Sequence, residues 1–154
     1  MKIGIFLRLY EINIAYGRIK ADFYTEHTSI LKNRGKVIIG KAGAGFPNSK
    51  IELLNNYIKT NEFLILFLYN AKQKKLYKAK VINVSNDLPS DSSLYPSYYT
   101  ELSAIKLSFT SIELIEVDLI TLEMLRLATN KRNIVDVIKS CRTSCMIIEY
   151  EQEP

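Results

Sequence analysis

The sequence predicts an α+β fold in which a sheet of about five to seven strands is surrounded by short helices. Three observations indicate this fold. Short apolar runs rich in β-branched residues recur between turn signals, which is typical of strands. A helix signal interrupts them near the middle of the chain. The 154 residues are 47% hydrophobic, which is enough for the core of one globular domain. We therefore expect a single domain over residues 1–154.

The elements expected before residue 41 are mostly strands. Lys2–Leu9 alternates in hydrophobicity and predicts a strand, and Ile12–Tyr16 is a second candidate that ends at the Gly17 turn. Phe23–Leu31 is compatible with either a short helix or a loop. The β-branched run Lys36–Gly40 predicts a buried strand.

The next segment predicts a turn followed by a helix. Glycine and proline turn signals fill residues 43–47. Ser49 and Glu52 then match the S-x-x-E capping box, so we expect a helix to begin at Ser49 and to end near Asn61.

A strand pair follows this helix. The apolar run Phe63–Tyr69 predicts the central strand of the sheet. After a basic turn, residues 75–84 alternate imperfectly, as expected where a strand bends around a small barrel.

The rest of the chain begins with a polar loop, Ser85–Thr100, which carries two prolines and three tyrosines. A loop of this length is usually functional or disordered, and the tyrosines argue against simple disorder. Ile105–Phe109 and Ile112–Val117 predict two strands, or one strand and an extended approach. Thr121–Asn130 predicts a helix.

The C-terminal part predicts one more helix and a last strand. Asn133 is a candidate N-cap for the helix, and Cys145–Tyr150 is the candidate strand. Cys141 and Cys145 are either a pair, if the turn between them allows it, or buried thiols.

Charge and composition narrow the function classes. The formal net charge is +5 and the pI is about 9.1, which indicates either a polyanionic partner or a merely soluble basic protein. One histidine and two cysteines offer no zinc cluster, no visible acid–base pair and no disulfide framework. We therefore predict no catalytic residue, no metal and no cofactor. No signal peptide or membrane-spanning run is recognised, which predicts a cytoplasmic location without membrane contact.

One apparent nucleotide-binding motif is rejected. Gly35, Gly40 and Lys41 match the start of a P-loop, G-x-x-x-x-G-K. Residue 42 is alanine instead of the hydroxyl residue that binds magnesium, and Lys36–Ile39 is expected to be a strand. Lys41 is instead a candidate phosphate contact of a nucleic acid.

The candidate binding residues are basic and aromatic. Phosphate contacts are expected from Arg34, Lys41, Lys72, Lys74 and Lys75. The alternative for the lysine-rich turn is a solvated face or protection of a sheet edge. A base would face Phe46, Tyr69, Tyr95, Tyr98 and Tyr99. The alternative for the three loop tyrosines is that they form a small core of the loop itself.

Residues 35–84 and 95–130 resemble a known family. The order of strand, glycine-rich turn, helix, apolar strand and basic hairpin, followed by Pro-Ser-Tyr-Tyr at residues 96–99, is similar to EVE-type domains of the PUA-like superfamily. In particular it resembles the N-terminal specificity domains of McrB-type modification-dependent restriction proteins. The resemblance implies a small bent β-barrel that holds a modified base in an aromatic pocket. Relatives often use tryptophan there; this chain has none, so tyrosine and phenylalanine would take its place.

The resemblance also implies partners. The chain would be the N-terminal recognition module of a longer protein, with a GTP-hydrolysing motor that drives homo-oligomerisation and a separate nuclease subunit. Its own role would be to bind modified, methylated DNA by flipping a base. The alternatives are an RNA-binding PUA-like module and an interaction domain that docks a protein through residues 85–100. An enzyme acting on RNA or a base is the least favoured.

Overall fold

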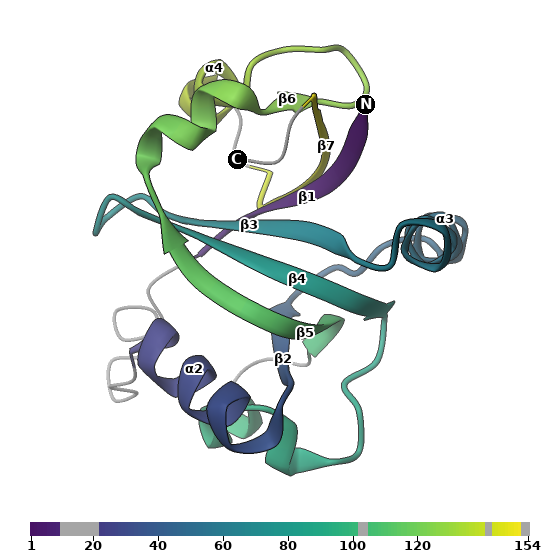
Figure 1. The fold of residues 1–154 in the computed structure, drawn as a ribbon, viewed down its shortest axis with the longest axis vertical. Helices are drawn as coiled ribbons and strands as arrows, with labels where there is room; N and C mark the ends of the chain where they lie inside the picture. The colour runs from purple at the N-terminus through teal and green to yellow at the C-terminus, as the bar shows by residue number, and fades with distance from the viewer. Residues whose placement is uncertain (10–21, 102–104, 141–142, 152–154) are drawn as a thin grey trace. The chain divides into compact units, whose positions relative to one another are not determined.

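The computed structural model describes residues 1–9, 22–101, 105–140 and 143–151 and confirms the α+β class (Figure 1). The strands form a mixed seven-stranded sheet in the order β2-β5-β4-β3-β1-β7-β6. The strands are β1 Lys2–Arg8, β2 Val37–Ala42, β3 Leu64–Asn70, β4 Lys75–Ser85, β5 Ile105–Val117, β6 Arg126–Leu127 and β7 Cys145–Tyr150. The helices are α2 Phe23–Arg34, α3 Asn48–Asn61 and α4 Ile134–Ser140, with 3₁₀ helices η1 Ser92–Leu94, η2 Ser97–Glu101 and η3 Leu119–Met124. None of the helices in the described ranges is both long and apolar enough to cross a membrane.

The chain divides into two compact units. Unit 1 is built from Met1–Glu11, Ile65–Ala79 and Ile115–Pro154, and unit 2 from Ile12–Leu64 and Lys80–Leu114. Strands β4 and β5 each contribute residues to both units. The expectation of a single domain over the whole chain stays a prediction.

Unit 1 is organised around the apolar strands at its centre. Strand β1 pairs in parallel with β3 and antiparallel with β7, so that Phe6 lies opposite Phe67 on one side and Met146 on the other. A side chain at Gly4 would place its Cβ 2.8 Å from the carbonyl oxygen of Ile65, so glycine permits this close pairing. Residues 65–68 of β3 are almost wholly buried, as predicted for a central strand.

The segment after β5 differs from the prediction. The expected helix over Thr121–Asn130 is wrong: η3 ends at Met124, and Arg126–Leu127 is extended as β6. Strand β6 pairs antiparallel with β7, which supplies backbone partners that outweigh the helical propensity of this segment.

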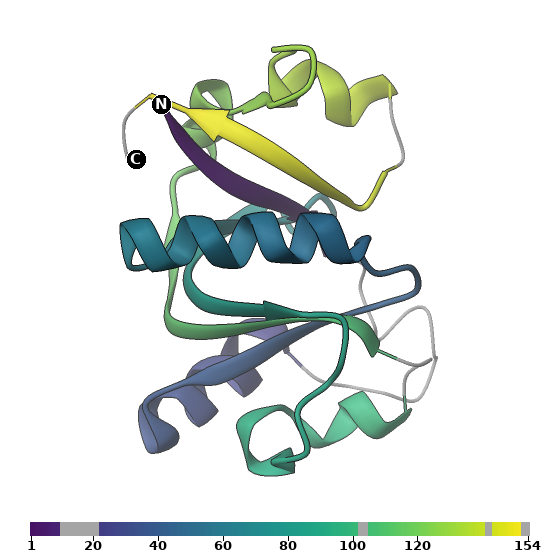
Figure 2. The same ribbon diagram turned by 90° about the vertical axis from the view of Figure 1, so that its right-hand side faces the viewer.

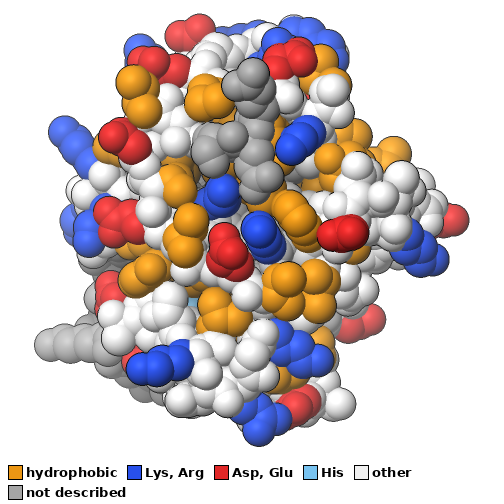
Figure 3. Space-filling view, in the orientation of Figure 1, with side chains coloured by type: hydrophobic (Ala, Val, Ile, Leu, Met, Phe, Trp, Pro, Cys, Tyr) orange, Lys and Arg blue, Asp and Glu red, His pale blue; other side chains and the backbone are white. Residues whose placement is uncertain are grey.

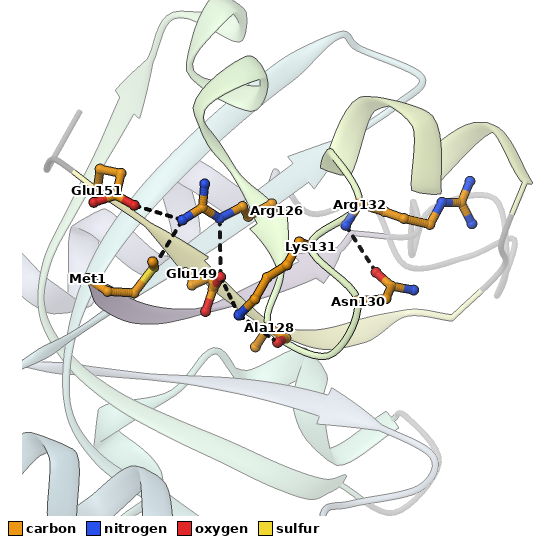
Figure 4. A network of polar contacts seen from close by, with 8 residues as sticks. All are labelled: Met1, Arg126, Ala128, Asn130, Lys131, Arg132, Glu149 and Glu151. Carbon is orange, nitrogen blue, oxygen red and sulfur yellow. Dashed lines mark hydrogen bonds and ion pairs between the residues drawn. The ribbon is translucent and has the colours of Figure 1, made fainter.

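Ionic contacts fix β6 on β7 (Figure 4). Glu149, whose side chain is 8% exposed, contacts the Arg126 guanidinium at 3.1 Å and the Lys131 ammonium at 2.6 Å. Arg126 also contacts Glu151 at 2.7 Å and the sulfur of Met1 at 3.2 Å. The network therefore ties the first residue to the two final strands of unit 1.

Unit 2 carries the helices α2 and α3. Strand β2 pairs antiparallel with β5, and Figures 1 and 2 show α2 beside β2, in the same part of the molecule as η1 and η2. Helix α3 buries Leu54 and Ile58, which lie four residues apart on one face. Helix α2, left open between helix and loop, is capped by Asp22, whose carboxylate accepts the amide hydrogen of Thr25 at 2.9 Å.

Other expected elements have mixed outcomes. The capping box at Ser49 is wrong, because α3 begins at Asn48 and its N-cap is Pro47, with no side-chain cap. The Asn133 cap is confirmed: its side-chain oxygen accepts from the Val135 amide at 2.9 Å. The two candidate strands after residue 104 are one continuous strand, β5. The candidate strand Ile12–Tyr16 lies outside the described residues.

Candidate nucleic-acid interface

The loop over residues 85–100, hereafter the tyrosine loop, folds around its own aromatic core. Tyr98 and Tyr99 are only 7% and 4% exposed, and Leu88 and Tyr95 pack against them. The Tyr95 and Tyr99 rings stack with centroids 5.7 Å apart and planes 12° apart. This arrangement is the alternative that the sequence left open. Tyr98 and Tyr99 therefore present no ring face to solvent, and their burial does not support a contact with a base.

A chain of hydrogen bonds fastens the tyrosine loop to β2 and α2. The Gly40 amide donates to the Tyr99 hydroxyl oxygen at 3.0 Å. The His27 Nδ1 lies 2.8 Å from the carbonyl oxygen of Phe23, so Nδ1 carries the hydrogen. Nε2 of the neutral ring is then an acceptor, and the Tyr99 hydroxyl donates to it at 2.5 Å. One tyrosine oxygen thus joins the sheet edge to the helix.

Burial keeps the His27 ring and the Tyr99 hydroxyl neutral. Desolvation lowers the pKa of His27 from 6.5 to about 4, although its bond to the Phe23 carbonyl acts in the opposite direction. Desolvation also raises the pKa of the Tyr99 hydroxyl well above its ordinary value. This role of His27 could not be predicted, because a single histidine in a segment of undecided structure has no predictable partner.

The glycine loop, residues 43–47, leads from β2 into α3 and is shaped by packing. Gly43 has φ +93°, a conformation that favours glycine. A Cβ on Gly45 would lie 2.3 Å from the carbonyl oxygen of Lys106 and 2.4 Å from the side-chain oxygen of Asn86. Both glycines are therefore required by the fold itself.

The same loop holds Phe46 in a fixed position. The Phe46 amide donates to the side-chain oxygen of Asn86 at 3.0 Å, and the Asn86 side-chain nitrogen donates to the Phe46 carbonyl at 2.7 Å. The Phe46 ring is half-buried, and the Lys50 ammonium lies 5.5 Å from its centroid. Phe46 is thus a partly exposed aromatic face with a cation beside it.

The start of α3 makes this corner electropositive. Its N-cap has no side-chain hydrogen bond, and its first turn holds no acidic residue. The Lys41 ammonium folds over the glycine loop and donates to the carbonyl of Ala44 at 3.0 Å. An uncapped helix N-terminus with two lysines nearby favours an anion. Lys41 and Phe46, both predicted from the sequence, are brought together here.

Unit 2 contains a second residue that was predicted to contact phosphate, Arg34. Arg34 ends α2 and pairs with Asp91 at 3.7 Å, with about half of each side chain exposed. Asp91 also caps η1 by accepting the Ser93 amide. Arg34 therefore joins α2 to the tyrosine loop, and an exposed ion pair of this kind leaves its guanidinium open to further contacts.

The remaining predicted residues belong to unit 1. Lys72, Lys74 and Lys75 are exposed at the turn between β3 and β4, where Lys74 has φ +52°. The half-buried Tyr69 ring lies 6.2 Å from that of Phe6. On the face shown in Figure 3, basic side chains are interspersed with acidic ones. These three lysines form a small exposed basic cluster at the turn.

Within the described ranges, no group of three or more His, Cys, Asp or Glu residues is placed to hold a metal ion. Comparisons with protein-family models, with curated proteins and with solved structures find no match.

Proposed function

We propose that this chain is a non-catalytic DNA-binding domain that recognises modified, methylated DNA. The observation that carries the proposal is the corner at the start of α3, where Lys41 and Lys50 flank an uncapped helix N-terminus next to the Phe46 ring. The net charge of +5 is in keeping with a polyanionic partner. The resemblance to McrB-type specificity domains supplies the choice of modified DNA.

In this proposal a backbone phosphate lies at the amide groups that begin α3. Lys41 and Lys50 neutralise it, and the released counterions make binding depend on salt. The Phe46 face stacks on a base. Flipping a base out of a duplex costs a few kcal/mol, and stacking returns ~1–3 kcal/mol per base. Since Tyr98 and Tyr99 are buried, Phe46 takes the part first expected of them.

The finer expectations belong to the same proposal. They are a bent PUA-like barrel, a cytoplasmic location, and a place in a McrB-like restriction system with a motor that forms homo-oligomers and a nuclease subunit. Lys72, Lys74 and Lys75 remain candidate phosphate contacts in this proposal.

A binding panel tests the proposal. Fluorescently labelled duplexes, methylated and unmethylated, are titrated with the protein at two salt concentrations, and unlabelled RNA of the same sequence is used as competitor. We expect tighter binding to methylated DNA and weaker binding at high salt. Equal binding to both duplexes would reduce the function to nonspecific DNA binding, and preferential competition by RNA would replace DNA as the partner.

A further inference from the structure

Asn86 joins two loops that are distant in the sequence. It is the second residue of the tyrosine loop, and its side chain bonds both backbone groups of Phe46 in the glycine loop. One side chain that both accepts and donates in this way replaces a partner strand for that residue. Among the small side chains, only an asparagine amide supplies both groups with this reach.

The connection continues through the tyrosine loop. The Ser108 hydroxyl, which is buried, donates to the carbonyl of Asp87 at 2.7 Å. Leu88 packs against Tyr98 and Tyr99. Tyr99 in turn accepts the Gly40 amide, and Gly40 precedes Lys41 and the glycine loop. The tyrosine loop is therefore joined to the glycine loop through Asn86 and to β2, which precedes the glycine loop, through Tyr99.

We infer that Asn86 positions the Phe46 face for ligand contact and couples the glycine loop to the tyrosine loop. This inference rests on the proposed function for its ligand, and on the two hydrogen bonds for its geometry. Lys41 and Lys50 attract the phosphate, whereas Asn86 touches no ligand and acts through Phe46. Removing Asn86 should then weaken binding without changing the number of phosphates contacted.

A second asparagine of unit 2 provides a matched control. The Asn55 side chain of α3 accepts from the Val84 amide at 3.0 Å and donates to the Val84 carbonyl at 2.8 Å. It therefore makes the same pair of bonds as Asn86, but to β4 and away from the glycine loop. Asn86→Ala and Asn55→Ala each delete one such pair.

The first experiment measures duplex affinity against salt for the wild type, Asn86→Ala, Asn55→Ala and Lys50→Gln. Asn86→Ala should weaken binding by about tenfold, as expected when one stacking contact is lost, with an unchanged salt slope. Lys50→Gln should lower the slope by about one. Equal affinity of the two asparagine variants would overturn the positioning role while leaving the proposed function in place.

The second experiment needs no DNA. Amide hydrogen exchange is measured over residues 43–47 and 97–101 in both asparagine variants. Asn86→Ala should speed exchange in both segments, and Asn55→Ala in neither. Faster exchange in residues 43–47 alone, or in neither segment, would overturn the coupling. If the wild type binds no duplex, the ligand part falls with the proposed function, and exchange alone decides the coupling.

Discussion

The Tyr99 hydroxyl donates to Nε2 of His27 at 2.5 Å and accepts the Gly40 amide at 3.0 Å. Both side chains are almost fully buried, so water does not replace these bonds. The contact joins residues 72 positions apart and fixes the tyrosine loop on the edge strand β2. One hydroxyl group therefore links the tyrosine loop to both β2 and α2.

Tyr99→Phe should destabilise the protein by about 1–3 kcal/mol, because it leaves a buried acceptor on His27 and a partly buried donor on Gly40 without a partner. Urea unfolding at pH 7 measures this change. Tyr95→Phe is the control, since it makes the same chemical change in the ring stacked on Tyr99. Equal effects of the two substitutions would contradict the bonding described for Tyr99.

His27 should make the stability depend on pH. Its pKa falls from 6.5 to about 4 on folding, so between these values the unfolded chain binds a proton that the folded chain does not. The contribution is fully present above pH 6.5 and is lost as the pH falls towards 4; in total it is on the order of 3 kcal/mol.

Urea unfolding at pH 7 and pH 5 compares the wild type with His27→Gln, which does not titrate. The wild type should lose more stability over this interval than the variant does. A parallel decline in the two proteins would show that other groups cause the pH dependence.

Glu149→Gln should lower the melting temperature at pH 7. The Lys131 ammonium, opposed by burial and aided by Arg126, holds the pKa of Glu149 below its ordinary value. The stabilisation is present above the unfolded pKa and is lost as the pH falls through the lower folded pKa. The difference from wild type should therefore shrink at pH 3.

Glu151→Gln serves as the control for that comparison. The Glu151 side chain is 64% exposed, and an exposed ion pair contributes little. A melting temperature as low as that of Glu149→Gln would argue against a special role of the buried carboxylate. Calorimetry of the three proteins at both pH values supplies the data.

The strands were predictable where local pattern decides them. Lys2–Leu9, Phe63–Tyr69 and Cys145–Tyr150 are apolar runs, and they match β1, β3 and β7 to within one residue at each end. Strand β6 was not predictable, because its two residues pair with β7, whose residues are distant in the sequence. Helix α2 was hard to predict because it has no apolar stripe that would be typical of a helix. His27 is its only buried residue in the described ranges.

The candidate site was predictable in part. Turn signals and charge indicated the glycine loop and Lys41. The need for glycine at position 45 could not be predicted. A Cβ there would meet the carbonyl oxygen of Lys106 and the side chain of Asn86, and both residues are distant in the sequence. The burial of Tyr98 and Tyr99 depends on a histidine more than seventy positions away. Contacts between residues so far apart in the sequence cannot be predicted from the local pattern of residues.

The most direct test of DNA binding at the start of α3 is the salt dependence of duplex affinity in two lysine variants. Lys50 and Lys59 are exposed lysines at opposite ends of this helix, so Lys50→Gln and Lys59→Gln change the net charge equally. We predict that affinity falls steeply with salt and that the slope drops by about one for Lys50→Gln alone. Affinity that is insensitive to salt, or equal slopes in the two variants, would contradict the proposed interface.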